Sequence, residues 1–405
     1  MTIHSEDLST SASPRRIPAC KPRLLSWYAK SIICLANRQR EMKTQFWDVI
    51  CVAVVCVVLS LGLWPFHSPK NDVAWQGDRN GLRFGRFSTV ISSGAFPKTS
   101  EENEPSGTVE VWLQPRRIWD QSTFLAYYDP GNPYQFSLRQ SNGGFELHAG
   151  IQGDPTIARR RILYLKNTFL RSPLVFLTIT SGTHGTSVYA DGVLVGTAPQ
   201  VLLSTGELTG RLVVGDSPRQ TDSWSGRLLG LAIYRRELTP AQVTRHYRTW
   251  TQKGRPEVSG NDHNLALYLF GERKGRIVHD DAGSGVNLYI PEKYVVLDQI
   301  RLEPFWKEFS MSRSYWSAVL KNVVGFIPFG FCFYACLSEH KVRSAALATV
   351  ILGTLTSLTI EVLQAWLPTR DSGMTDLFTN ALGTWIGAIA CRTVSPALAA
   401  IFRDL

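Results

Sequence analysis

The segment between positions 57 and 331 contains no cysteine, although the 405-residue chain has seven. A structural disulfide is therefore not expected there. The chain also lacks a CxxC pair and any metal-ligand spacing, and Cys332 and Cys336, at i and i+4, are interpreted as small apolar residues on a helix. We predict no metal and no cofactor. Neither a helix-turn-helix nor a zinc finger accompanies the formal charge of +10, so no nucleic-acid partner is expected.

Long apolar runs are absent from residues 67–314 but occur on both sides of them. Residues 46–66 form a run with one charge near its edge, and about 20 such residues suffice to cross a bilayer as a helix. Three further apolar stretches follow, at residues 315–337, 344–367 and 376–394. The sequence therefore predicts an α-helical transmembrane bundle of four spans, the last three within residues 315–395.

Charge predicts the orientation of these spans. Before the first span, eight Lys or Arg residues face three Asp or Glu residues. Basic residues in short flanking segments stay in the cytoplasm. We therefore expect a multi-pass protein of the cytoplasmic (inner) membrane with both termini cytoplasmic, residues 67–314 extracytoplasmic, and residues 396–405 as a short cytoplasmic tail.

Residues 1–45 are predicted to be a basic, disordered cytoplasmic tail. An interfacial helix is the alternative, because Leu24, Tyr28 and Ile32 recur on one helical side. Met42 is also a plausible start of translation, so the sequence does not establish whether residues 1–41 are translated. Cleavage of the first span as a signal peptide is a further alternative.

The extracytoplasmic segment has an all-β texture. Short runs rich in β-branched and aromatic residues recur between turn residues, as in a sandwich. Asp191-Gly192 between two apolar runs predicts a hairpin, because both turn positions require positive φ. Thr239 followed by Pro240 predicts the start of a helix, with Val243 and Tyr247 on one face.

Four stretches of this segment resemble the concanavalin A-like, laminin-G-like jelly-roll domains: GTVEVWLQP (107–115), 173–196, 210–216 and 224–247. The resemblance implies an all-β sandwich over residues 67–300 that binds a glycan or a protein. Residues 266–285 resemble the motif that usually opens such a domain, and are expected to supply a closing strand or to be the remnant of a second copy. Some relatives bind calcium, which nothing in this sequence supports.

Glycan-hydrolysing relatives of this domain place an acid and a nucleophile on one strand, often spaced E-x-D-x-x-E. That spacing is absent here, so hydrolysis by the sandwich is not expected. The glycan-binding residues are not predicted. Trp119, Tyr127, Tyr128 and Tyr134 are aromatic residues able to stack on sugars, although core packing is the expected role for most of them.

Polar residues within the C-terminal apolar stretches form the sharpest functional signal, because polar groups in hydrocarbon are costly and usually mark a site. Ser357, Glu361 and Gln364 lie on one helical stripe, and Asp376 and Asn380 lie on another. With Asn322, Arg370 and Asp371 they are predicted to form one outward-facing polar cluster, in which Arg370 is a counter-charge for Glu361 or Asp376. Helix packing is assigned to Gly325, Pro328, Gly330, Gly383 and Gly387.

The stretches NVVGFIPFG (322–330), SLTIEVLQ (357–364) and RDSGMTDLFTNALGTWIG (370–387) resemble the VanZ-like family of membrane proteins. The founding member of that family is associated with resistance to the glycopeptide teicoplanin. The resemblance covers about the last 90 residues and the first span, and makes the sandwich an insertion into the first external loop, with residues 301–314 as a linker. It implies a cell-envelope context but no particular reaction.

Three functional hypotheses remain open. The favoured one is a non-enzymatic envelope protein whose polar cluster binds a lipid or lipid-linked glycan, and whose sandwich binds an envelope polysaccharide or protein. The second is a membrane enzyme acting on a lipid-linked substrate, with Glu361 as general base and Asp376 as its partner. In the third, the polar residues only hold the helices together. The oligomeric state is not predicted.

Overall fold

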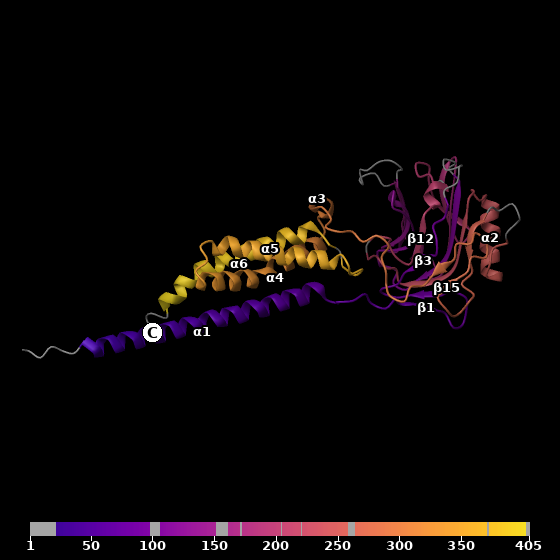
Figure 1. Cartoon of the computed structure of the whole chain (residues 1–405). Coiled ribbons are helices and arrows are strands. Elements are labelled where there is room, and N and C mark those ends of the chain that lie inside the picture. The colour runs from indigo at the N-terminus through magenta and orange to yellow at the C-terminus, as the bar shows by residue number, and fades with distance from the viewer. Residues whose placement is uncertain are drawn as a thin grey trace, which may run out of the picture.

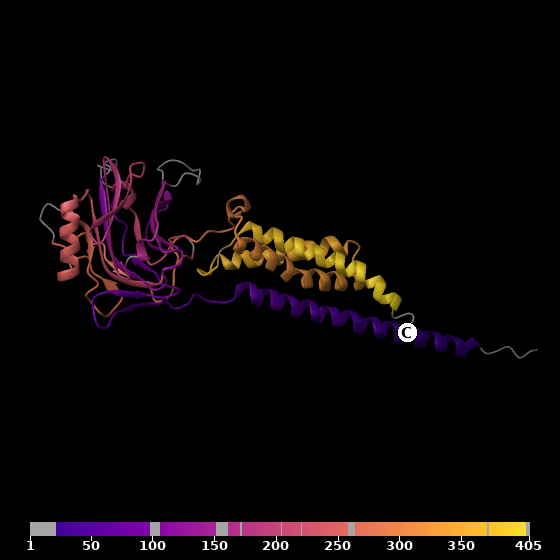
Figure 2. The same cartoon turned by 180° about the vertical axis from the view of Figure 1, so that it is seen from behind.

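The computed structural model describes residues 22–97, 106–150, 161–170, 172–203, 205–219, 221–257, 264–370 and 372–401. A β-sandwich lies at one end of the molecule and a bundle of helices extends from it (Figure 1). The view from behind shows the same two parts, and places both described ends of the chain at the end of the bundle away from the sandwich (Figure 2). The predicted fold class, a helical bundle plus an all-β sandwich, is confirmed.

Two antiparallel sheets form the sandwich. The first has the order β1 (Val73–Trp75), β2 (Leu82–Phe84), β13 (Gly226–Tyr234), β4 (Gly107–Pro115), β9 (Val175–Gly182), β10 (Gly185–Ala190) and β11 (Val193–Ala198), with β14 (Asn264–Tyr268) paired to β13. The second has the order β15 (Ile277–Val278), β16 (Leu288–Tyr289), β3 (Val90–Ser92), β12 (Arg211–Val214), β5 (Ser122–Asp129), β6 (Asn132–Ser141), β7 (Gly144–Ala149) and β8 (Arg161–Leu165).

Alternating side chains of the two sheets fill the space between them. On β4, Val109, Val111 and Leu113 are fully buried in this core, which also receives Leu125 from the second sheet. Such alternation gives each strand one core-facing row. The predicted hairpin is confirmed, because Asp191 and Gly192 have φ of 52° and 78° between the paired residues Ala190 and Val193.

Helix α2 (Pro240–Lys253) covers the outer face of the first sheet (Figure 1). It begins as predicted: the Thr239 side chain accepts a hydrogen bond from the Gln242 N–H, and the Gln242 side chain accepts one from the Thr239 N–H. This capping box satisfies two otherwise unpaired donors. Val243 and Trp250 bury the inner face of α2 in a second, smaller core.

The segment at residues 266–285 closes both sheets. Strand β14 pairs with β13 in the first sheet. Strand β15 pairs with β16, which pairs with β3 in the second sheet. The closing-strand interpretation is therefore confirmed, and the segment belongs to a single sandwich.

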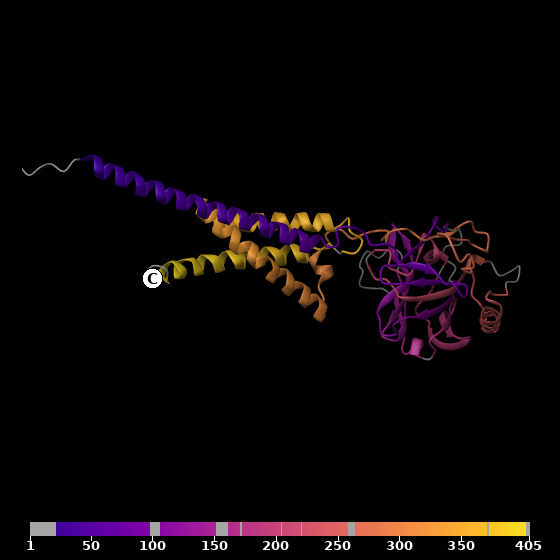
Figure 3. The same ribbon diagram turned by 90° about the horizontal axis from the view of Figure 1, so that it is seen from below.

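Among the described residues, five helices lie outside the sandwich: α1 (Pro22–Leu63), α3 (Phe305–Glu308), α4 (Arg313–Glu339), α5 (Ala345–Gln364) and α6 (Met374–Ile401). Seen from below, α1 lies along the bundle formed by α4, α5 and α6 (Figure 3). In the described part of the chain, three segments are long and apolar enough to cross a membrane: Glu41–Leu63, Tyr315–Glu339 and Ala345–Gln364.

The prediction of four spans is wrong by one on this criterion. The fourth stretch, 376–394, lies within the 28-residue helix α6, which is not among the three candidate spans. Asp376, Asn380 and Arg392 lower its apolar character. Helix α6 nevertheless packs within the bundle against α4 and α5 (Figure 1).

The N-terminal boundary also differs from expectation. Helix α1 begins at Pro22 and runs without interruption to Leu63, so residues 22–45 are helical rather than disordered. Residues 1–21 lie outside the described residues. The expected linker at residues 301–314 contains the short helix α3 and the first residues of α4.

Candidate functional site

The predicted polar cluster is built around the N-terminus of α6. Glu361, in the last turn of α5, accepts a hydrogen bond of 2.9 Å from the N–H of Gly373, immediately before α6 begins. The Ser372 hydroxyl donates to the Glu361 carbonyl at 3.0 Å. The first N–H groups of a helix lack partners within it, and its positive end favours an anion. Glu361, which is 1% exposed, therefore has one structural task.

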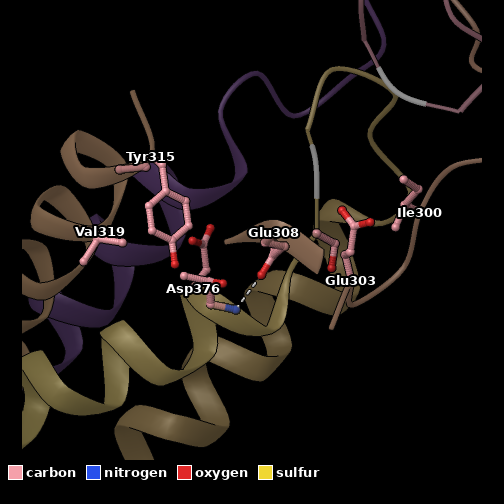
Figure 4. Close-up of a pocket in the computed structure, with 9 residues that line it drawn as sticks. Ile300, Glu303, Glu308, Tyr315, Val319 and Asp376 are labelled. Atoms are coloured by element: carbon pink, nitrogen blue, oxygen red, sulfur yellow. Dashed lines mark hydrogen bonds between the residues drawn. The ribbon is translucent and has the colours of Figure 1, made fainter. Parts of the chain in front are cut away.

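A second carboxylate caps the same terminus from α3. Glu308 accepts a hydrogen bond of 2.8 Å from the N–H of Thr375 (Figure 4). A Cβ on Gly373 would lie 1.5 Å from the Glu308 Oε1 atom, so the Glu308 carboxylate would have to move if residue 373 carried a side chain. Sequence analysis missed Glu308 because it lies in the presumed linker, outside every apolar run.

Two hydrogen bonds join the polar stripes of neighbouring helices. Asn322 of α4 donates to the Asp376 carboxylate at 2.6 Å, and Asn380 of α6 donates to the Ser357 hydroxyl of α5 at 2.9 Å. The structure therefore brings together the residues that helical spacing selected. Among the described residues, the buried Oδ1 of Asn380 and Oε1 of Gln364 have no hydrogen-bond partner. Such unpaired buried acceptors are costly unless a ligand or water supplies a donor.

These residues line a cavity of about 260 Å³ between α1, α4, α5 and α6. One side of the cavity is apolar, with Val58, Leu61, Phe326 and Ile360. The other side is polar and carries two cations and two carboxylic acids: its residues are Lys321, Asn322, Glu361, Gln364, Arg370, Asp376 and Asn380. Its two faces suit the polar end of an amphipathic ligand.

A second cavity of about 280 Å³ lies between the linker and the outer ends of α4 and α6 (Figure 4). Glu303, Glu308 and Tyr315 contribute to its wall, and Asp376 lines both cavities. A third, of about 620 Å³, adjoins it through Glu303 and is bordered by Arg219, Arg301 and Lys307, among others. Neighbouring cavities thus share wall residues, Asp376 between the first and second and Glu303 between the second and third.

Arg370 lines the first cavity, but its guanidinium donates to the carbonyl of Trp64, with the Nε–O distance at 3.1 Å. Gln364 donates to the carbonyl of Gly62 at 2.8 Å. Both bonds tie the α5–α6 region to the end of α1. The counter-charge role of Arg370 stays a prediction, and Asp371 lies outside the described residues.

The glycines assigned to helix packing divide into two groups. A Cβ on Gly383 would lie 2.2 Å from the Val323 carbonyl oxygen, and Cβ atoms on Gly387 and Gly330 would meet backbone oxygens just as closely. Backbones of α4 and α6 approach each other at these positions. Gly325 is different, because nothing lies within 4 Å of its added Cβ and it lines the first cavity. Pro328 lies exposed within the continuous helix α4.

The sandwich contacts the bundle through the 216–224 loop and the linker. Thr221 donates to the Pro368 carbonyl at 2.6 Å, and Gln299 donates to the Arg370 carbonyl at 2.8 Å. Asp216 organises the loop: it is fully buried and accepts hydrogen bonds from Ser217 N–H, Asp222 N–H, and the hydroxyls of Ser223 and Tyr294. Burial raises the pKa of Asp216 to about 7, although the hydrogen bonds act in the opposite direction.

The sandwich also holds a buried carboxylate, Glu110 on β4. Tyr234 and Trp250 donate to its Oε2 at 2.8 and 3.1 Å, and His246 lies 3.0 Å from its Oε1. Glu110 and His246 are both 0% exposed. This network fastens α2 to the sheet, as expected for a structural group.

The four aromatic residues considered for sugar stacking differ in their solvent exposure. Tyr127 is fully buried in the core, so a stacking role for it is wrong, whereas Trp119 is 66% exposed in the loop between β4 and β5. Tyr128 is half-buried, and the side chain of Tyr134 is outside the described part of the structure.

Comparison with known proteins shows what each of the two parts of the chain resembles. No curated protein matches it significantly. Similar solved structures include a Bacteroides ovatus protein (12% identity, 55% of this chain, 58% of that chain, TM-score 0.36). They also include the heptameric SAP-like pentraxin of Limulus polyphemus (16% identity, 56% of this chain, 94% of that chain, TM-score 0.33). A third is the Ruminococcus gnavus IT-sialidase CBM40 bound to α2,3-sialyllactose (12% identity, 41% of this chain, 95% of that chain, TM-score 0.31).

The chain covers 58% of the Bacteroides ovatus structure and 45% of a botulinum neurotoxin type C structure, less than two thirds of either. Family models give the sharper result. The VanZ/LLP1 match begins at residue 272, between β14 and β15, so it includes β15, β16 and the linker as well as helices α3 to α6. Residues 91–244 match the concanavalin A-like lectin/glucanases superfamily and residues 272–395 match VanZ/LLP1, which confirms the architecture of a laminin-G-like sandwich joined to a VanZ-like helical segment.

Proposed function

We propose that this protein binds the polar end of a lipid or lipid-linked glycan in the cavity at the sandwich end of its bundle, while the sandwich binds an envelope polysaccharide or protein. In the proposed orientation α6 crosses the membrane together with the three candidate spans, both termini are cytoplasmic, and the sandwich and the cavity lie toward the outer side of the cytoplasmic membrane. The location of both described chain ends away from the sandwich supports this orientation (Figure 2).

The observation that carries the proposal is the pair of unpaired acceptors in the cavity. Asn380 and Gln364 each bury a carbonyl oxygen without a hydrogen-bond partner among the described residues. A ligand with hydroxyl or ammonium donors would satisfy both oxygens. The two cations and two acids of the wall favour a ligand with little net charge or with both signs.

Cavity size limits what enters. A volume of about 260 Å³ admits a headgroup or a single sugar rather than an extended glycan. The apolar side formed by Val58, Leu61 and Phe326 would contact the adjoining acyl or prenyl carbons. The remaining sugars of a lipid-linked glycan would extend toward the sandwich, through the adjoining cavities.

Lipid retention tests the bundle half of the proposal. The full chain is purified in mild detergent and the bound lipids are identified by native mass spectrometry, for the wild type, Glu361→Gln and the control Glu41→Gln. Glu41 is exposed at the other end of the bundle. We expect the wild type and the control to retain a lipid that Glu361→Gln loses by about tenfold, equivalent to one charge-assisted hydrogen bond. Equal retention by all three proteins would overturn this half.

Glycan binding tests the sandwich half. The full chain in detergent is applied to a panel of envelope glycans, alongside Trp119→Ala and the control Trp306→Ala. Trp119 is an exposed aromatic residue of the sandwich, whereas Trp306 is exposed in α3. A glycan that the wild type and the control bind, but Trp119→Ala does not, would support stacking at Trp119. Binding to no member of the panel would refute the lectin role.

Linkage to cell-wall antibiotics is the physiological part of the proposal. Strains carrying Glu361→Ala, or lacking residues 67–300, are compared for sensitivity to teicoplanin at matched protein abundance. Matching sensitivities would place both parts in one pathway. Wild-type sensitivity in both strains would remove the connection to resistance or exopolysaccharide handling.

A membrane enzyme remains the second candidate, because Glu361 and Asp376 line the same cavity. With Glu361 as general base, Glu361→Gln would still bind the lipid substrate but would not convert it. Loss of binding together with activity would instead favour the binding role.

A further inference from the structure

A second cluster of polar side chains lies between α1 and α4, near the end of the bundle opposite the sandwich. On α4, the Cys336 thiol donates to the Asp48 carboxylate at 3.2 Å, and the His340 Nε2 lies 2.9 Å from the same oxygen. The ligand atoms of Asp48, Cys336 and His340 all lie within 4.8 Å of one another. Cys336 is buried, whereas Asp48 and His340 are exposed.

The spacing of these residues places two ligand types at the end of α4. Cys336 and His340 are four positions apart. Positions i and i+4 share one helix face. The interpretation of Cys336 as only a small apolar residue is therefore incomplete, because its sulfur points at polar atoms of another helix.

We propose that Asp48, Cys336 and His340 bind Zn²⁺, with a water molecule as the fourth ligand of the tetrahedron. Carboxylate oxygen, thiolate sulfur and imidazole nitrogen are the ligands that zinc prefers in proteins. At metal–ligand distances of about 2.0–2.3 Å, neighbouring ligand atoms of a tetrahedron lie roughly 3.3–3.8 Å apart. The present separations of 2.9 and 3.2 Å therefore widen by a few tenths of an ångström on binding. The Cys336 thiol releases its proton, and the imidazole binds through Nε2 in its neutral form.

This site is separate from the proposed lipid cavity. Asn322 of the cavity and Cys336 are 14 positions apart on α4, which corresponds to about 21 Å along the helix. Metal binding would join α1 to the end of α4. Because α1 leads directly into the sandwich, the metal would fix the helix that carries that domain.

Metal content of the full chain tests the proposal. Wild-type protein, Cys336→Ser, His340→Gln and the control Cys56→Ser are purified in detergent, loaded with Zn²⁺, dialysed, and analysed by inductively coupled plasma mass spectrometry. Cys56 is exposed on α1 and outside the cluster. We expect about one Zn²⁺ per chain for the wild type and Cys56→Ser, and affinity at least about tenfold weaker for the two ligand variants.

Two further measurements separate metal binding from failure to fold. Co²⁺ loaded in place of Zn²⁺ should give the visible bands of tetrahedral cobalt and a thiolate charge-transfer band in the wild type, both lost in Cys336→Ser. Zn²⁺ should raise the unfolding temperature of the wild type and of Cys56→Ser, but not of His340→Gln. Zinc retained equally by all four proteins, or bound by none of them, would overturn the proposal and leave the cluster as hydrogen bonds at the end of α4.

Discussion

Glu110 in the sandwich and Glu361 in the bundle are both glutamates with almost no exposed surface, at 0% and 1%. Their surroundings differ. Glu110 is enclosed by three side chains that reach it from two elements, Tyr234 of β13 and His246 and Trp250 of α2. Glu361 receives one N–H at its carboxylate and borders open volume. Glu110 is thus enclosed by its partners, whereas the cavity beside Glu361 leaves room for a ligand.

The largest effect is expected from Glu110→Ala. This substitution leaves the Tyr234 hydroxyl, the Trp250 N–H and the His246 ring without their shared acceptor in a dry core. Removing one partner of a buried charged network costs about 3–5 kcal/mol. Thermal unfolding of the full chain in detergent, followed by tryptophan fluorescence, should show this loss. The control Glu292→Ala removes an exposed partner of Arg276 and should change stability by less than about 0.5 kcal/mol. Equal effects of the two substitutions would show that the Glu110 network does not hold α2.

Asp216 is a third buried carboxyl group, and it makes the stability of the fold depend on pH. Its pKa is about 7 in the folded protein against an ordinary 3.8. Between these values the folded state holds a proton that the unfolded chain releases, so stability is greatest at the acid end and falls as pH rises toward 7. The slope for one such group is about 1.4 kcal/mol per pH unit. Unfolding measured from pH 5 to 8 should show the fall, flattening above pH 7.

Asp216→Asn is the control for that slope. An amide does not titrate in this range, so the variant should be less pH-dependent than the wild type between pH 5 and 7, even if it is less stable overall. An unchanged slope would assign the pH dependence to other groups.

Sequence patterns predicted the elements whose signals are local. The hairpin at Asp191-Gly192 and the start of α2 at Thr239 depend on a few neighbouring residues, and both formed as expected. Helical spacing likewise placed Ser357 and Asn380 on polar stripes of two helices, and their side chains form a hydrogen bond.

Local sequence patterns did not predict the contacts between distant segments. Glu308 caps α6 from a segment without any apolar pattern, and Asp48 meets His340 across 292 positions of sequence. The extent of α1 was missed for another reason, because basic residues that suggest a solvated tail are equally compatible with a helix continuing out of the bilayer.

Two glycines of the bundle allow a closely packed position to be compared with an open one. Gly383→Ala would place a Cβ against the Val323 carbonyl, where the backbone must shift, and overpacking of this kind costs about 1–3 kcal/mol. Gly325→Ala adds a methyl group to open volume, so the free energy of unfolding is expected to change by less than about 0.5 kcal/mol. Unfolding temperatures in detergent compare the two variants. A larger loss for Gly325→Ala would mean that α4 and α6 do not meet at Gly383.

The smallest effect on stability is expected from Glu361→Gln, although the same residue is central to the proposed site. The Gln carbonyl can still accept the Gly373 N–H, and the adjoining cavity leaves room for the new amide hydrogens. The unfolding temperature should therefore stay close to that of the wild type, and the free energy of unfolding should change by less than about 0.5 kcal/mol.

Glu361→Ala is the matched variant, since it removes the acceptor and should cost about 1–3 kcal/mol for the N–H left unpaired. A loss for Glu361→Gln as large as that for Glu110→Ala would make the two glutamates equivalent, and the carboxylate of Glu361 would then be a structural cap of α6. A stable Glu361→Gln protein that no longer retains lipid would separate them, because only a group facing a ligand loses function without losing the fold.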